Sequence, residues 1–140
     1  MAAERNLELY IPNILGFEKI AMDFVASAAK KMGFSGERIE DLKTAVSEAC
    51  INAIEHGNKM DARMKVGIVL KPEDMKLQVT VHDEGNGIGK VKTPRIEDKI
   101  ECKDKPRGWG IFLIKNLVDE VKFESTPEGG NLVRMTVCAD

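Results

Sequence analysis

Three short motifs hold the residues of this chain that could do chemistry. The first is SEACINAIEHG with Glu48 and Asn52, the second is DEGNGIG, which opens on Asp83, and the third is RGWGIFLIKNL with Gly108 and Gly110. A glycine pair alone is usually no more than a turn. Together the motifs supply a carboxylate and an amide on one helix, an acid followed by glycines, and a glycine pair before a later helix. These are the parts of an ATP site.

The first motif offers a general base and a metal ligand. Glu48 and Asn52 are four residues apart, so they share one face of a helix. The neutral amide oxygen of Asn52 suits Mg²⁺, which completes its octahedron with phosphate oxygens and water. Glu48 would stand one turn earlier, placed to accept a proton from an attacking hydroxyl, and it is the predicted catalytic residue. Taken alone, the pair is more typical of an exposed Glu and Asn on an ordinary amphipathic helix, and only the other motifs reverse this preference.

The second motif places an acid at the end of a strand. Asp83 follows the alternating residues of the preceding segment directly, and its carboxylate could accept a hydrogen bond from the exocyclic amine of adenine. Guanine presents a carbonyl at that position, so the same acid would reject it. Gly85 and Gly87 permit close approach of the backbone to a ligand. A hairpin or loop turn is the competing interpretation of this motif.

The third motif predicts phosphate binding. Gly108 and Gly110 begin a helix, whose free N–H groups can bind phosphate, and Arg107 adds a charged fork suited to the same group. The preceding residues, 90–108, show almost no apolar periodicity and predict a long mobile loop that closes over a triphosphate. A solvated loop of mixed charge explains most of its lysines equally well.

Hydrophobic periodicity places these motifs on a small α/β architecture. The first helix should be capped by Asn13, end near Gly33 and bury a face of seven residues: Ile14, Phe17, Ile20, Ala21, Phe24, Val25 and Ala28. The predicted order is a strand over 7–11 stopped by Pro12, helices over 13–33 and 37–56, a hairpin of 66–70 and 77–81 turning at 72–74, a helix over 110–117, and strands over 121–125 and 132–137. We expect one domain over residues 1–140, a two-layer α/β (α+β) sandwich with a mixed, mostly antiparallel sheet and helices on one face.

The composition of the chain limits the classes of partner and the cellular compartment to be expected. A net charge of -2 and a pI near 5.8 give no global field for nucleic acid or an anionic membrane. The three cysteines are scattered without a CxxC pair, which indicates reduced thiols and a cytoplasmic protein. No apolar run approaches the roughly 18 residues of a membrane helix. Direct nucleic-acid and membrane partners are therefore not expected.

Over nearly its whole length the chain resembles the ATP-binding domain shared by gyrase, the heat-shock chaperone, the mismatch-repair ATPase and sensor histidine kinases, the Bergerat fold. The strings SEACINAIEHGN, VHDEGNGIG and RGWGIFLIKNLVDEV look most like bacterial anti-sigma-factor serine kinases. The resemblance implies a homodimer that sequesters a sigma factor. It further implies that ATP, with Mg²⁺, is used to phosphorylate a serine of an anti-anti-sigma (STAS-type) partner.

The same resemblance assigns roles motif by motif. It makes Glu48 the base, Asn52 the magnesium ligand and Asp83 the adenine acid, with the glycines of the second and third motifs serving as lid hinge and phosphate site. The chain departs from the family at Asn131, where a threonine commonly supports the adenine carboxylate. Asparagine can still hydrogen-bond there, directly or through water. The alternative function is a nucleotide-gated switch that binds partners without transferring phosphate.

Overall fold

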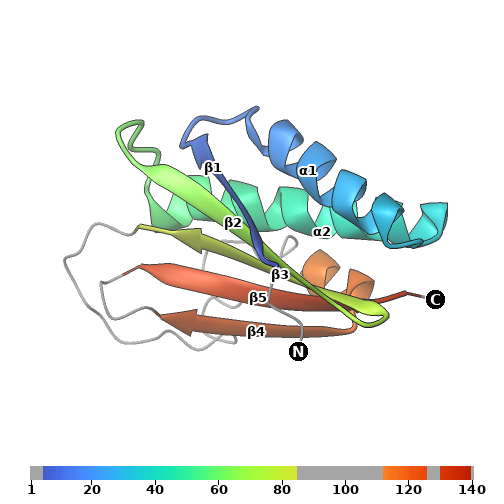
Figure 1. Ribbon diagram of the computed structural model, residues 1–140. Coiled ribbons are helices and arrows are strands. Elements are labelled where there is room, and N and C mark those ends of the chain that lie inside the picture. The colour runs from blue at the N-terminus through green and yellow to red at the C-terminus, as the bar shows by residue number, and fades with distance from the viewer. Residues whose placement is uncertain (1–4, 85–111, 126–129, 140) are drawn as a thin grey trace.

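The computed structural model describes residues 5–84, 112–125 and 130–139. Within them two helices lie on one face of a five-stranded sheet (Figure 1). Residues 112–117 are also helical. The elements are β1 (Leu7–Pro12), α1 (Glu18–Lys31), α2 (Gly36–Asn52), the π-helical turn η1 (Ala53–Gly57), β2 (Lys65–Glu73), β3 (Lys76–Asp83), β4 (Glu120–Ser125) and β5 (Asn131–Cys138).

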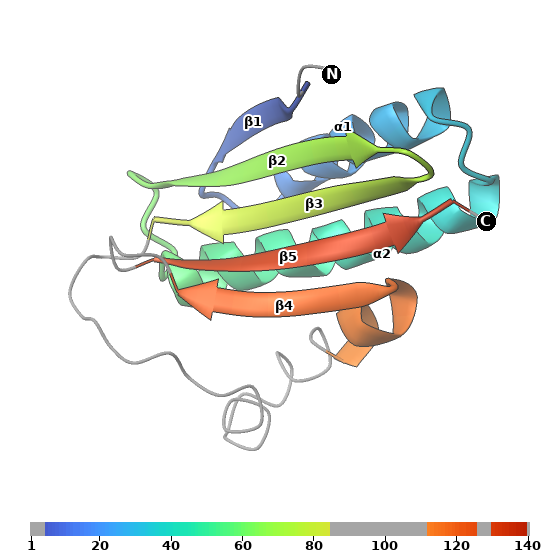
Figure 2. The ribbon, with the colours of Figure 1, turned by 60° about the horizontal axis from the view of Figure 1, so that its bottom comes forward.

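The sheet confirms the predicted two-layer sandwich. Its strand order is β1-β2-β3-β5-β4, and each of these neighbouring pairs is antiparallel (Figure 2). In β3 and β5 every second residue is buried, as expected for strands with one face against helices and one toward solvent. The core between the layers draws its largest fully buried side chains from both: Ile11, Leu42, Ile54, Ile68, Leu70, Leu77, Ile114 and Met135.

The start of the first helix differs from the prediction. Phe17, not Asn13, occupies the N-cap position, and no side chain caps the helix. Asn13 is 1% exposed, and its amide instead donates to the Asp61 carbonyl and accepts from Asn58. Ile14 and Ile20, predicted to be buried, are 45% and 48% exposed. The chain after Pro12 forms a turn anchored by a buried asparagine, so the helical phase begins later than the apolar spacing indicates.

The connection between α1 and α2 explains why one helix ends and the next begins. Gly33 has φ +90°, and the Phe34 N–H donates to the Ala29 carbonyl at 3.1 Å, which is the Schellman arrangement. The Ser35 hydroxyl then accepts from the Arg38 N–H and caps α2. The end of α1 and the start of α2 are therefore both fixed by residues of this short connection.

The β2–β3 hairpin is confirmed, but its turn is shifted along the chain. Pro72 pairs with Leu77 inside the ladder, and the turn consists of Asp74 and Met75, the latter at φ 59°. The predicted turn at 72–74 was therefore too early. Because proline has no N–H to donate, it is tolerated here near the strand end.

Different elements come together at the two ends of the sheet. At one end, Arg38 near the start of α2 contacts the Asp119 carboxylate at 2.6 Å, and the same carboxylate accepts from the Cys138 N–H at 2.7 Å. At the opposite end, the last turn of α2, the end of β3 and the start of β5 lie together (Figures 1 and 2). The candidate site residues that the structure describes, Glu48, Asn52, Asp83 and Asn131, lie at or toward this second end. None of the helices in the described part of the chain is long and apolar enough to cross a bilayer.

Candidate nucleotide site

The last turns of α2 carry the first pair of candidate residues. Glu48 and Asn52 are both half-buried, and the neighbouring Ala45 and Ala49 are buried in the core. The α-helix ends at Asn52. The pair therefore lies at the border between the core and solvent, where the sequence predicted it.

A π-helical turn follows Asn52, where the sequence predicted α-helix through His56. In η1 the Asn58 N–H donates to the Ala53 carbonyl at 2.7 Å, so the ladder is one residue wider than in an α-helix. Such turns are rare and are found frequently at functional sites. Gly57, predicted to stop the helix, is instead the last residue of this turn.

Asp83 is the buried acid of the site. Its residue is 7% exposed at the end of β3, and its Oδ1 accepts from the Asn131 main-chain N–H at 3.1 Å. The bond comes from the backbone, so a threonine at position 131 could make the same one. Asn131 thus contacts the predicted adenine acid, although its own side chain is not what makes this bond.

Two glycines allow Asp83 to lie where it does. A Cβ built on Gly57 would be 2.0 Å from Asp83 Oδ2, and one built on Gly130 would be 2.4 Å from the Asp83 carbonyl oxygen. Real Cβ atoms do not come that close to other heavy atoms. Gly57 therefore brings the turn after Asn52 into direct contact with the acid, which links the first motif to the second.

The structure does not describe all of the predicted site residues. Five of them lie outside the described residues: Gly85, Gly87, Arg107, Gly108 and Gly110. Two buried asparagines lie at the same end of the molecule: Asn13, which the sequence predicted only as a helix cap, and Asn58, to which it assigned no role. A buried asparagine leaves no periodic signal in one sequence, and although Asn58 ends the string SEACINAIEHGN, nothing in that string shows that its side chain is buried.

The donor set fits a magnesium ion that brings most of its own ligands. No cluster of three or more histidine, cysteine, aspartate or glutamate side chains that could hold a metal occurs among the described residues. An amide oxygen at Asn52 suits a cation that keeps water and phosphate oxygens.

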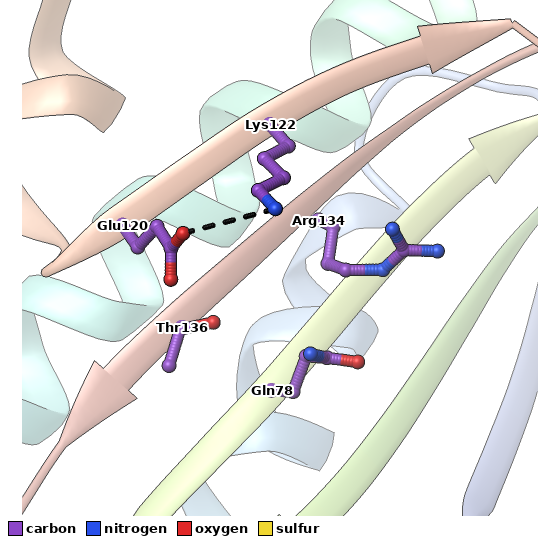
Figure 3. A pocket seen from close by; sticks show the side chains of 5 residues that line it. All are labelled: Gln78, Glu120, Lys122, Arg134 and Thr136. Atoms are coloured by element: carbon purple, nitrogen blue, oxygen red, sulfur yellow. Dashed lines mark ion pairs between the residues drawn. The ribbon is translucent and has the colours of Figure 1, made fainter.

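A shallow depression on the other face of the sheet is separate from this site. It is lined by side chains of β3, β4 and β5 that point away from the helices (Figure 3): Gln78, Glu120, Lys122, Arg134 and Thr136. Glu120 and Lys122 form an ion pair at 3.9 Å. Its lining is polar and solvated, whereas the acid of the candidate site is buried between η1 and β5.

Comparison with known proteins identifies the family to which the chain belongs. An acid at a strand end lies beside a helix bearing a glutamate and an asparagine, and the helices cover one face of an antiparallel sheet. The model of the histidine kinase-like ATPase domain matches residues 18–137. The chain belongs to the histidine kinase-like ATPase family.

Similar proteins include serine-protein kinases and anti-sigma factors. The chain is 32% identical to the serine-protein kinase RsbW of Bacillus licheniformis, over 89% of this chain and 78% of that protein. It is 34% identical to the anti-sigma F factor of Bacillus subtilis, over 85% of this chain and 82% of that one. The anti-sigma F factor of Thermoanaerobacter sp. is 37% identical, over 85% and 83%. The predicted resemblance to anti-sigma serine kinases is confirmed.

Solved structures support the fold. The RsbU and RsbW domains of a Mycobacterium tuberculosis protein superpose with a TM-score of 0.69 at 18% identity, over 99% of this chain and 33% of that longer one. The catalytic domain of the histidine kinase ThkA superposes with a TM-score of 0.58 at 14% identity, over 99% and 97%. At these identities the likeness concerns the fold alone.

Proposed function

We propose that this chain is an ATP-dependent serine-protein kinase of the anti-sigma type, which phosphorylates an anti-anti-sigma protein and sequesters a sigma factor. One observation carries the proposal. In a member of this family, the buried Asp83 lies against the turn that directly follows Asn52, one helical turn after Glu48. An acid, an amide and a candidate base thus lie on neighbouring elements toward one end of the fold.

Asp83 selects the base of the nucleotide. Its carboxylate is held by the Asn131 N–H on one oxygen and accepts a hydrogen bond from the exocyclic amine of adenine. A carboxylate cannot donate to the carbonyl that guanine presents, so ATP is preferred over GTP. Gly85 and Gly87 let the backbone approach the ligand, and Arg107, Gly108 and Gly110 bind its phosphates.

Glu48 is the general base of the transfer. Its carboxylate takes the proton of the partner's serine hydroxyl as the serine oxygen bonds to the γ-phosphorus. The bond from that phosphorus to the β–γ bridging oxygen breaks, and ADP leaves with the electron pair. The Asn52 amide oxygen would hold Mg²⁺, and the bound ion would neutralise part of the charge of the phosphates.

The partners follow from the same proposal. The proposed partners, a sigma factor and a STAS-type protein, are both proteins. The proposed location of the chain is the cytoplasm, where these partners act. A homodimer is supported by large apolar side chains that remain exposed on β1 and on the turn and helix after it: Leu7, Tyr10, Ile14, Leu15 and Ile20. A sedimentation coefficient of a monomer at micromolar concentration would contradict the dimer.

Phosphate transfer is the test of the proposed reaction. We expect the chain, mixed with γ-labelled ATP, Mg²⁺ and its small anti-anti-sigma partner, to label one serine of that partner. Chelating the Mg²⁺ should stop the labelling, and Asn52→Ala should raise the Mg²⁺ concentration that is needed. Mass spectrometry of the partner checks the position of the phosphate.

The controls separate this function from a pure switch. A partner whose acceptor serine is replaced by alanine should stay unlabelled. If ATP binds and the partner is captured but no phosphoserine forms, the chain is a nucleotide-gated switch. If neither ATP nor partner binds, both functions are wrong.

A further inference from the structure

The buried polar residues of the described part of the chain all lie at one end of the fold. They are Asn13, Asn58 and Asp83, with exposed fractions of 1%, 2% and 7%. Only Asp83 has a role in the proposed site. Burying an amide costs free energy unless its groups are hydrogen-bonded, so the bonds of the two asparagines show what they hold.

Asn58 is the centre of a network that joins four segments. Its Nδ2 donates to Asn13 Oδ1 and to the Lys65 carbonyl oxygen, each at 3.0 Å. Its Oδ1 accepts from the Glu84 N–H at 2.9 Å. One side chain thus ties the end of η1 to the β1–α1 turn, to the start of β2, and to the residue after Asp83.

Only an amide can make this set of bonds. Two N–H donors and one oxygen acceptor are used at once, and aspartate has no donor while serine has one. The Glu84 N–H belongs to the peptide group that follows Asp83, so Asn58 fixes the main chain on one side of the acid. Gly130 and the Asn131 N–H approach Asp83 from β5.

We propose that Asn58 is a positioning residue for the nucleotide base, acting through the Glu84 amide to hold the Asp83 carboxylate in the orientation that accepts from adenine. The proposal rests on the proposed function of Asp83. Asn58 makes no contact with nucleotide in this scheme. Its effect is on where the carboxylate points, and hence on the choice between ATP and GTP.

Base selectivity is the readout, because a residue that only stabilises the fold would not change it. In calorimetric titrations of the full chain with Mg-ATP and Mg-GTP, Asn58→Ser should weaken ATP binding about tenfold and lower the ratio of ATP to GTP affinity. Ile54→Val is the matched control, since Ile54 is fully buried in the same turn. It should lower the melting temperature and leave the ratio unchanged.

Three outcomes decide the matter. An unchanged ratio of ATP to GTP affinity in folded Asn58→Ser overturns the positioning role. If Asn58→Ser does not fold at the titration temperature, Asn13→Ala takes its place, because it removes one hydrogen-bond partner of the Asn58 amide. An unchanged affinity ratio in Asn13→Ala also overturns the positioning role. Asp83→Asn is titrated in parallel. If it binds ATP as the wild type does, the proposed function fails and this inference with it, whereas a loss confined to Asp83→Asn overturns the role of Asn58 alone.

Discussion

Replacing Glu48 by glutamine should abolish phosphate transfer while leaving nucleotide binding intact. Glutamine keeps the size of the side chain but cannot take the proton of the serine hydroxyl. Loss of a general base lowers a rate by about 10²- to 10⁴-fold. The measurement is the initial rate at which labelled phosphate enters the partner, compared with the calorimetric affinity for Mg-ATP.

The matched control for this variant is Glu37→Gln. Glu37 is an exposed acid in the first turn of the same helix, so the substitution makes the same change of charge on α2, far from the site. We expect full transfer activity. Transfer by Glu48→Gln at the rate of the control would show that another group is the base.

Gly57→Ala should remove nucleotide binding through a single methyl group. The new Cβ would lie 2.0 Å from Asp83 Oδ2 and 2.3 Å from its Cγ, so the acid must turn away or η1 must shift. Overpacking of this kind costs about 1–3 kcal/mol of folding stability. Because the displaced group is the acid proposed to bind adenine, the loss of binding free energy for ATP should exceed the loss of folding free energy.

Gly36→Ala is the control, since both glycines lie in the α2–η1 segment. A Cβ at Gly36 meets nothing within 4 Å, and its φ is not positive. Adding a methyl group there should be neutral or stabilise the protein by about 0.4–1 kcal/mol. Denaturant unfolding and Mg-ATP titration of both variants check the prediction. Normal ATP affinity in Gly57→Ala would mean that the acid is not confined as the structure indicates.

Much of the fold could be predicted because the spacing of apolar residues along a helix or strand follows from which of its faces is buried. The alternation in β3 and β5 fixes which face meets the helices, and a one-residue slip would reverse it. The face shared by Glu48 and Asn52 follows from the helical repeat in the same way. Asp83 could be placed at a strand end because the alternation stops there.

What could not be predicted depends on contacts between distant segments. Asn13 resembles a helix cap in the sequence, but it is held by Asn58 and Asp61, some 45 and 48 residues away. The π turn after Asn52 is equally hidden, since its residues suit an α-helix. Gly57 resembles a helix stop, and only the position of Asp83 shows that it is needed for close approach.

The central claim is that Asp83 holds an adenine nucleotide at the end of the sheet where β3 meets η1. Its most direct test is a calorimetric titration of Mg-ATP into the wild-type chain and into Asp83→Asn. We expect tight binding by the wild type and a loss of about 10- to 150-fold in the variant, because hydrogen bonds to a charged group contribute about 1.5–3 kcal/mol. Equal affinity of the two proteins for ATP would contradict the account.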